Sequence, residues 1–243
     1  MINILQLTDT HLLADRQGEM FGVNTYSALQ GLLKSIQARI NSVEYIFLTG
    51  DVSQDMSVES YQHVIKLLEP LQKPIYWIAG NHDDKKVMAD AFNDSPLFHP
   101  LDFLRLGDWG FFMLDTVAAN EDKGYLQEET LTRNIPAVPY LACMMHHHPI
   151  DVGGALIDKY KLQNTELLLP FFSKQNVTPN LIITGHVHGA YQTKLMDIPV
   201  ISSPATCFQF SKGTNKLAID KISGCTFWQF ENNGSFEFET VFC

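Results

Sequence analysis

Five short apolar segments, spread from the N-terminus to residue 184, each lead directly into a cluster of Asp, Asn, His and Gly residues. Their length and their β-branched and aromatic content are typical of buried strands. They are Ile2–Leu7, Tyr45–Thr49, Ile75–Ala79, Leu141–Met145 and Leu181–Thr184. In an α/β sheet the carboxyl ends of the strands collect at one rim, where ligands bind. We therefore expect the five polar clusters to meet in space, although they span most of the chain.

The remaining segments predict helices in the earlier part of the chain and mostly strands near its carboxyl end. Helical spacing of apolar residues predicts helices over Asn24–Ile40, from the N-cap Ser57 to Pro70, over Asp84–Phe92 and around Leu162–Phe172. The other expected strands are Phe103–Leu106, Gly110–Asp115, Tyr191–Leu195, Val200–Ser202, Thr206–Phe210, Lys216–Ile222, Thr226–Phe230 and Phe236–Phe242. This order predicts an α/β (α+β) fold. No linker, repeat or charge run divides the chain, so we expect one domain over residues 1–243.

The composition disfavours several classes of partner. The formal net charge is −10 and no Lys/Arg cluster forms a basic groove, so we expect no nucleic-acid partner. The four cysteines form no C-x-x-C pair, which favours a reduced, cytoplasmic setting. No signal peptide precedes the first strand, and no apolar run is long enough to span a membrane, so we expect no membrane partner. We expect a monomer or a homodimer.

The polar clusters resemble an inventory of metal ligands. They are Asp9–His11, Gly50–Asp51, Gly80–Asp83, His146–Pro149 and Gly185–His188, and they contain seven of the nine histidines. Asp, Asn and neutral His suit Fe, Mn, Zn or Co. No cysteine is in the set, which argues against a closed structural zinc site. The donors outnumber what one ion needs, and the Asp51 carboxylate can bridge two ions about 3.5–4 Å apart.

Each motif alone also has an ordinary structural explanation. Asp-x-His after a strand can cap a helix, Gly-Asp is common turn chemistry, and a run of three histidines can lie in a solvated loop. Five such motifs in this order, each at the end of an apolar strand, favour a metal centre over five separate coincidences.

The ordered motifs resemble the signature of the calcineurin-like metallophosphoesterases. That signature is D-x-H, G-D-x-x-x-D, G-N-H-D/E, H-x-P and G-H-x-H. Here it is present as Asp9-His11, Gly50-Asp51-Asp55, Gly80–Asp83, His147-His148-Pro149 and Gly185–His188. The resemblance implies a four-layer αββα sandwich with the active site at the carboxyl ends of the strands.

A finer resemblance is to the bacterial class III cyclic-nucleotide phosphodiesterases. The segments that carry it are Thr8–Leu12, Phe21–Thr25, His146–Ile150 and Pro204–Phe210. It implies a dinuclear-metal enzyme in which a metal-bridging hydroxide attacks phosphorus and converts 3′,5′-cyclic AMP to 5′-AMP. The expected cofactors are two metal ions, Fe and/or Mn, with Zn or Co also open. The chain departs from this group between Gly124 and Pro139, where an amphipathic helix and a tryptophan are missing, and in having no C-terminal extension.

The resemblance also implies a role for each donor. One ion would take Asp9, His11 and His188, the other Asn81, His147 and His186, and Asp51 would bridge them. His147 is preferred to His146 and His148 because it lies two residues before Pro149 and because strand alternation turns its neighbours to the opposite face. His82 is expected to be catalytic, contacting the phosphate or protonating the leaving oxygen. Asn81, His82 and His188 are expected to contact the substrate, and Asp55 to lie behind the ligands or at a helix cap.

Other functions stay open. A phosphodiesterase or phosphomonoesterase of broader specificity, acting on 2′,3′-cyclic nucleotides or glycerophosphodiesters, would carry the same ligand motifs. An inactive binding scaffold would be expected to lack ligands, and all seven are present here. A nuclease would be expected to have a basic groove with aromatic side chains for stacking.

Overall fold

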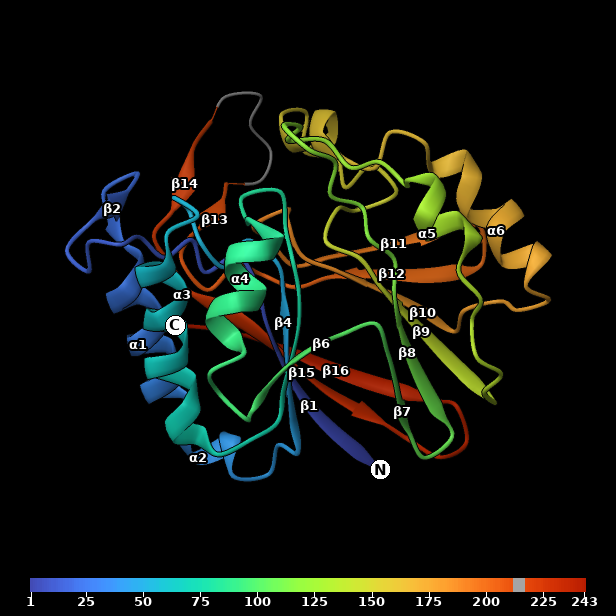
Figure 1. Ribbon diagram of the computed structural model, residues 1–243, viewed down its shortest axis with the longest axis horizontal. Helices are drawn as coiled ribbons and strands as arrows, with labels where there is room; N and C mark the ends of the chain where they lie inside the picture. Colours follow the sequence, from blue (N-terminus) through green and yellow to red (C-terminus); the bar gives the residue numbers. More distant parts are fainter. Residues whose placement is uncertain (212–216) are drawn as a thin grey trace.

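Two six-stranded sheets form the centre of the fold, and helices lie on their outer faces (Figure 1). The computed structural model describes residues 1–211 and 217–243. The strands of the first sheet, in spatial order, are β16 (Phe236–Phe242), β15 (Gly224–Phe230), β1 (Ile2–Leu7), β4 (Tyr45–Thr49), β5 (Ile75–Ile78) and β6 (Phe98–Pro100). Those of the second are β11 (Tyr191–Leu195), β12 (Ile198–Ser202), β10 (Leu181–Thr184), β9 (Tyr140–Met144), β8 (Trp109–Met113) and β7 (Phe103–Leu106).

Each sheet has a parallel middle and antiparallel additions. In the first, β1, β4, β5 and β6 are parallel, whereas β15 pairs antiparallel with β1 and β16 pairs antiparallel with β15. In the second, β8, β9, β10 and β12 are parallel, and β7 and β11 are antiparallel edge strands. The parallel order places the carboxyl ends of β1, β4 and β5 at one end of the first sheet, and those of β9 and β10 at one end of the second.

Helices from the two halves of the chain cover the two outer faces (Figure 1). The first sheet is covered by α1 (Thr25–Ser35), α2 (Gln37–Ile40), α3 (Val58–Leu68), η1 (Glu69–Leu71) and α4 (Lys85–Phe92), and the second by α5 (Glu128–Thr132) and α6 (Leu168–Lys174). Side-chain caps begin three of these helices: Asn24 accepts from Ser27 N, Ser57 from Ser60 N, and Asp84 from Lys86 N and Val87 N. The resulting αββα sandwich confirms the fold class expected from the sequence.

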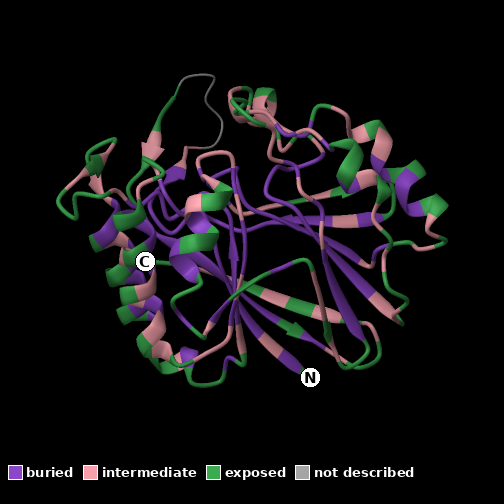
Figure 2. Cartoon of the chain, viewed as in Figure 1, coloured by how far each residue is buried: buried purple, intermediate pink, exposed green. Residues whose placement is uncertain are grey.

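Apolar side chains fill the three interfaces between these layers, and most strand residues are buried (Figure 2). Between the two sheets, the ring of Phe47 packs edge-on against Phe111 at 5.0 Å, and Trp109 packs against Phe230 at 4.8 Å. Because both faces of each sheet are covered, the central strands are continuous apolar runs rather than alternating ones.

Several predicted elements differ in their limits. The helix expected over Asn24–Ile40 is interrupted at Ile36, which separates α1 from α2. The helix expected from Leu162 begins as α6 at Leu168, after η3 (Thr165–Leu167); this puts Pro170 in its first turn, where its missing N–H costs no helical hydrogen bond.

The strand-rich end is also shorter than predicted in one place. Of the strand expected over Thr206–Phe210 only β13 (Gln209–Phe210) forms, paired with β14 (Ile219–Asp220); Lys216, in the next expected strand, lies outside the described residues. The short hairpin of β2 (Glu19–Met20) and β3 (Val23–Asn24) and the strand β6 were not predicted. Within the described residues no helix is long and apolar enough to cross a membrane.

Candidate metal centre

The loops that follow five strands bring their donors together, as the strand-end clusters predict. Three groups of donor atoms lie within 4.8 Å of one another: Asp9–His11–His188, His11–Asp51–His82 and Asp51–His146–His186. These residues follow β1, β4, β5, β9 and β10, so both sheets contribute. The groups share His11 and Asp51, and therefore form one continuous cluster.

The backbone of this cluster is strained. Asp9, His11, Asp51, His186 and His188 all have positive φ, between 44° and 69°. Left-handed backbone is unfavourable for residues that carry a Cβ, and it persists only where the surrounding structure enforces it. Five donors in this conformation indicate that the loops are shaped to aim side chains at a common point.

The glycines of the motifs are required by close packing around the donors. A Cβ on Gly50 would collide with His146 Nδ1 and the Gly80 backbone, and a Cβ on Gly80 would collide with Asp51. A Cβ on Gly185 would collide with Thr8 Oγ1 and reach 3.0 Å from Asp9 Oδ2. Glycine at these positions lets the loops approach one another closely enough for the donors to meet.

In the half of the cluster formed by Asp9, His11 and His188, the Nε2 atoms of the two histidines point their lone pairs at each other. His188 Nδ1 lies 3.0 Å from the Phe208 carbonyl oxygen and His11 Nδ1 lies 2.7 Å from Gln54 Oε1, so both rings donate through Nδ1. Their Nε2 atoms then face each other at 3.0 Å. Burial lowers the pKa of His11 to about 4 and that of His188 well below its usual value, which keeps both rings neutral. Two neutral acceptors at this distance repel unless a cation lies beside both.

Asp9 supplies an oxygen to the same half. Its Oδ2 accepts from Thr8 Oγ1 at 2.6 Å and from the His186 backbone N–H at 3.0 Å, while Oδ1 lies 3.6 Å from His188 Nε2. Burial raises the pKa of Asp9 to about 7. A nearby cation favours the ionised form of such a carboxyl group.

Asp51 lies between the two halves. Its Oδ1 accepts from the His82 backbone N–H at 2.9 Å, which fixes the carboxylate. Its Oδ2 is 3.6 Å from His11 Nε2 and 3.3 Å from His146 Nε2. Burial opposes ionisation, but the neighbouring His146 and His11 hold the pKa of Asp51 well below its usual value. This position supports the prediction that Asp51 bridges two ions.

In the other half, three buried donor atoms have no hydrogen-bond partner within the described chain: Asn81 Oδ1, His146 Nε2 and His186 Nε2. Buried polar atoms are normally paired, so the His146 and His186 nitrogens, which are grouped with Asp51, fit a cation. His146 Nδ1 is 2.9 Å from the Thr49 carbonyl oxygen, which leaves Nε2 to face Asp51. Burial lowers the pKa of His146, but the negative charge of Asp51 outweighs this effect and raises the pKa to about 9. Without a metal ion, a proton on Nε2 supplies the positive charge that faces Asp51.

His147, the ligand expected from the sequence, has protein partners for both of its ring nitrogens. Its Nδ1 lies 2.8 Å from Thr116 Oγ1 and its Nε2 lies 3.3 Å from the Asp122 carbonyl oxygen, so protein groups satisfy both ring nitrogens. The alternation argument fails because β9 ends at Met144 and the three histidines follow in a loop. We therefore propose His146 as the ligand from this loop, and metal analysis of variants of the two residues can decide between it and His147.

The other residues singled out in the sequence lie around this cluster. The half-buried His82 has its ring 5.0 Å from that of His11, edge to face, and is one of the donors grouped with Asp51. His148 Nε2 lies 3.3 Å from Asp158 Oδ1, and the His148 ring stacks against His186 at 5.7 Å. Asp55 lies outside the donor groups and accepts from Ala14 N and Ser57 Oγ, next to the N-cap of α3.

Sequence reasoning missed the groups that hold the donors in place. Gln54 orients His11, and Thr8 orients Asp9. The Asp83 carboxylate accepts from the backbone N–H groups of Gly80, Val52 and Ser53, and so joins the loops after β4 and β5. Asp83 is the fourth residue of the Gly80–Asp83 motif, and that was the one signal in the sequence that could have identified it.

Comparison with known proteins finds the same family that the sequence motifs resemble. The family model described as calcineurin-like phosphoesterase matches residues 2–190. The 3′,5′-cyclic adenosine monophosphate phosphodiesterase CpdA of Haemophilus influenzae is 32% identical, over 91% of this chain and 82% of that protein. The same enzyme of Escherichia coli K12 is 30% identical over the same shares. A probable cyclic nucleotide phosphodiesterase of Colwellia psychrerythraea is 34% identical, over 99% and 94%.

Solved structures with much lower sequence identity share the fold. A purple acid phosphatase from yellow lupin seeds superposes with a TM-score of 0.59 at 13% identity, over 93% of this chain and 49% of that one. An archaeal phosphodiesterase superposes with a TM-score of 0.50 at 13% identity, over 99% and 100%.

Proposed function

Because the chain belongs to the calcineurin-like phosphoesterase family, we propose that it hydrolyses 3′,5′-cyclic AMP to 5′-AMP at the donor cluster. The observation that carries this proposal is the position of Asp51 Oδ2 between the two halves of the cluster, 3.6 Å from His11 Nε2 and 3.3 Å from His146 Nε2. The names of the relatives, which are cyclic-nucleotide phosphodiesterases, support the choice of substrate.

We propose that the cluster holds two metal ions, Fe and/or Mn, with Zn or Co also compatible with the donors. Asp9, His11 and His188 would hold one, and Asn81, His146 and His186 the other, with Asp51 shared. When bound, such ions lower the pKa of a coordinated water and neutralise charge on a phosphate.

The chain's own residues would divide the remaining work. Water adds to phosphorus and the P–O3′ bond breaks, so the departing ribose oxygen needs a proton. His82, half-buried and fixed through its backbone N–H by Asp51, is the group we assign to donate that proton. We further assign Asn81 and His188 to contact the phosphate oxygens.

Product analysis tests the function. The purified enzyme, with its metal content measured, would be incubated with 3′,5′-cyclic AMP in ¹⁸O-labelled water. We expect 5′-AMP with one labelled phosphate oxygen. Formation of 3′-AMP, or no turnover with Mn²⁺ or Fe²⁺ supplied, contradicts the assignment. Rates on 2′,3′-cyclic AMP and glycerophosphodiesters that exceed the rate on 3′,5′-cyclic AMP would favour the broader-specificity alternative.

The setting of the enzyme is a separate proposal. We propose that residues 1–243 act as one domain, in the cytoplasm, as a monomer or homodimer, without a nucleic-acid or membrane partner. The core between the sheets, to which both halves of the chain contribute, supports the single domain. Analytical ultracentrifugation of the purified protein and fractionation of the source cells test these points.

A further inference from the structure

Three phenylalanines lie beside the metal centre on the side of His188. The rings of Phe208 and Phe210 pack against the His188 ring, with centroids 4.8 Å and 4.7 Å away. Phe21 meets Phe208 nearly at right angles, at 5.4 Å. We call Phe21, Phe208 and Phe210 the aromatic wall. It forms a continuous row of rings that begins at a donor of the cluster.

The outer member of the wall is exposed and held in an unusual conformation. Phe21 lies between β2 and β3, has φ 52° and leaves 48% of its surface exposed, whereas Phe208 is fully buried. Lys221 Nζ donates to the Gly22 carbonyl oxygen at 2.9 Å and ties this turn to the body of the protein. The turn thus holds a large apolar ring in solvent, next to the centre, at a cost in backbone strain.

From this arrangement we propose that the aromatic wall binds the purine base of the nucleotide, with Phe21 as its stacking surface. The inference rests on the proposed function and deepens it. In a cyclic nucleotide one ribose separates the phosphate from the base; in the protein one ring, Phe208, separates His188 from Phe21. With the phosphate at the donors, the base lies within reach of Phe21.

Stacking on Phe21 would favour a nucleotide without requiring a hydrogen bond to its base. A phenyl ring offers an apolar face that any purine can cover, so affinity is gained with little discrimination between adenine and guanine. The contact does not change as the P–O3′ bond breaks. It should therefore lower KM and leave kcat unaffected.

The test compares Phe21→Ala with Phe21→Tyr on two substrates. One is 3′,5′-cyclic AMP; the other is the same ribose 3′,5′-cyclic phosphate without a base. For Phe21→Ala we expect KM for cyclic AMP to rise about 5- to 150-fold, equivalent to about 1–3 kcal/mol of stacking, with kcat unchanged. KM for the abasic substrate should not change. Phe21→Tyr, which keeps the ring, should restore the wild-type KM.

A matched control is Met196→Ala. Met196 is also an exposed apolar residue at a hairpin turn with positive φ, 74% exposed with φ 54°, but it lies between β11 and β12. Its replacement should leave both KM values unchanged.

Several outcomes overturn the inference. An equal rise in KM for both substrates would show that Phe21 shapes the metal centre rather than binding the base. An unchanged KM for cyclic AMP in Phe21→Ala would show that the base lies elsewhere. Failure of the proposed function gives a different result, namely a wild-type enzyme that hydrolyses an aryl phosphodiester but not cyclic AMP.

Discussion

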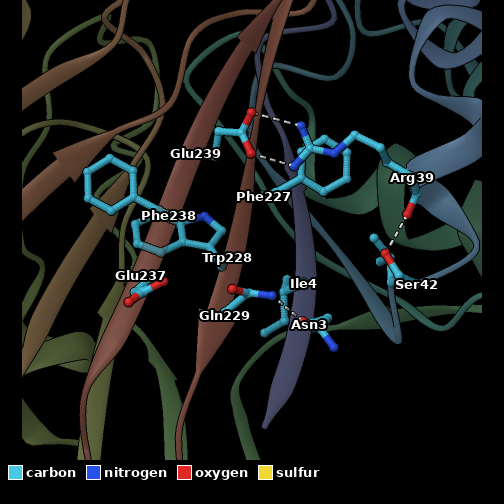
Figure 3. Close-up of a pocket in the computed structure, with 11 residues that line it drawn as sticks. Asn3, Ile4, Arg39, Ser42, Phe227, Trp228, Gln229, Glu237, Phe238 and Glu239 are labelled. Atoms are coloured by element: carbon cyan, nitrogen blue, oxygen red, sulfur yellow. Dashed lines mark hydrogen bonds and ion pairs between the residues drawn. The ribbon is translucent and has the colours of Figure 1, made fainter.

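Two regions beside β1 differ in how their buried polar atoms are paired. Beyond the carboxyl end of β1, the His11 and His188 Nε2 atoms face each other, and His186 Nε2 has no hydrogen-bond partner. Beside the amino end of β1 lies a cavity of about 200 Å³, lined by residues that include Asn3, Arg39 and Glu239 (Figure 3). There the Arg39 guanidinium lies 3.9 Å above the Phe227 ring and makes two hydrogen bonds to Glu239, at 2.8 and 3.1 Å. Asn3 accepts from Gln229.

The difference between the two regions lies in whether their buried polar atoms have hydrogen-bond partners. No lining side chain of this cavity, which lies wholly within the described residues, has a buried nitrogen or oxygen without a partner, and none of its residues has positive φ. At the donor cluster, three ligand candidates have unpaired buried atoms and five donors have positive φ. Unpaired buried polar atoms are costly, so a fold keeps them where a ligand completes them.

The largest expected effect comes from breaking the shared donor. Asp51→Ala removes the oxygen that faces both halves, so both ions should be lost or weakly held and activity should fall by several orders of magnitude. Elemental analysis together with the cyclic AMP assay measures this. A variant that keeps two ions per chain and wild-type activity would contradict the bridging position. One ion or none in active wild-type protein would contradict the two-metal centre itself.

A pair of substitutions tests whether His146 or His147 is the metal ligand that follows β9. His146→Ala should lose one of the two ions, because its Nε2 faces Asp51 Oδ2 at 3.3 Å and contacts no other protein group. His147→Ala should retain both ions, because protein groups hold both its ring nitrogens. Metal content measured on the two variants, with circular dichroism to verify folding, decides between them. The opposite result would restore His147 as the ligand.

This pair also shows how far sequence reasoning reaches. The convergence of Asp9, His11, Asp51, His186 and His188 could be predicted because parallel strands place their carboxyl ends at one rim. The choice among three adjacent histidines could not be made by a two-residue alternation, since that rule ends with the strand at Met144. The direction of a single side chain in a loop depends on the backbone conformation of that loop, which the spacing of residues in the sequence does not reveal.

The hydrogen-bond acceptors that orient the metal-binding histidines also could not be predicted from the sequence, because they come from distant segments. The Phe208 carbonyl oxygen that fixes His188 and the Gln54 amide that fixes His11 come from other parts of the chain. The turn between β2 and β3 was missed because two-residue strands leave no alternation to detect. By contrast, five strands have the predicted limits, because each is a segment of apolar residues or of residues that favour strands: β1, β4, β10, β11 and β16.

A substitution of His82 separates proton donation from metal binding. His82→Ala should keep both ions and lose roughly 10²–10⁴-fold in kcat/KM on cyclic AMP, the usual contribution of a general acid. On an aryl diester the loss should be much smaller, because a phenolate leaves without a proton. Equal losses on both substrates would indicate that His82 positions the phosphate. Loss of an ion would make it a ligand, as its place beside His11 and Asp51 allows.

A smaller effect is expected from the acceptor behind His11. Gln54→Met keeps the side-chain length but removes the oxygen that accepts from Nδ1, so the ring is no longer held in its tautomer. Removal of such a partner typically weakens metal affinity about 10–100-fold. Competition with a chelator measures the change, and Gln192→Met, at an exposed position on β11, is the control. Unchanged affinity would show that packing alone fixes His11.

The smallest effect is expected at the cavity beside β1. Arg39 and Glu239 are 40% and 66% exposed, and exposed ion pairs contribute roughly 0.2–1 kcal/mol even with good geometry. Glu239→Gln should therefore lower the free energy of unfolding by no more than about 1 kcal/mol. Salt should shrink the difference, because it screens exposed charges. Metal content and kcat/KM should not change, because Glu239 lies level with Leu5 through Phe227, about 13 Å of strand before Asp9, and neither Arg39 nor Glu239 contacts a donor. A loss of metal in this variant would mean that the ion pair and the donor cluster are coupled through β1, and the two could no longer be treated as independent regions.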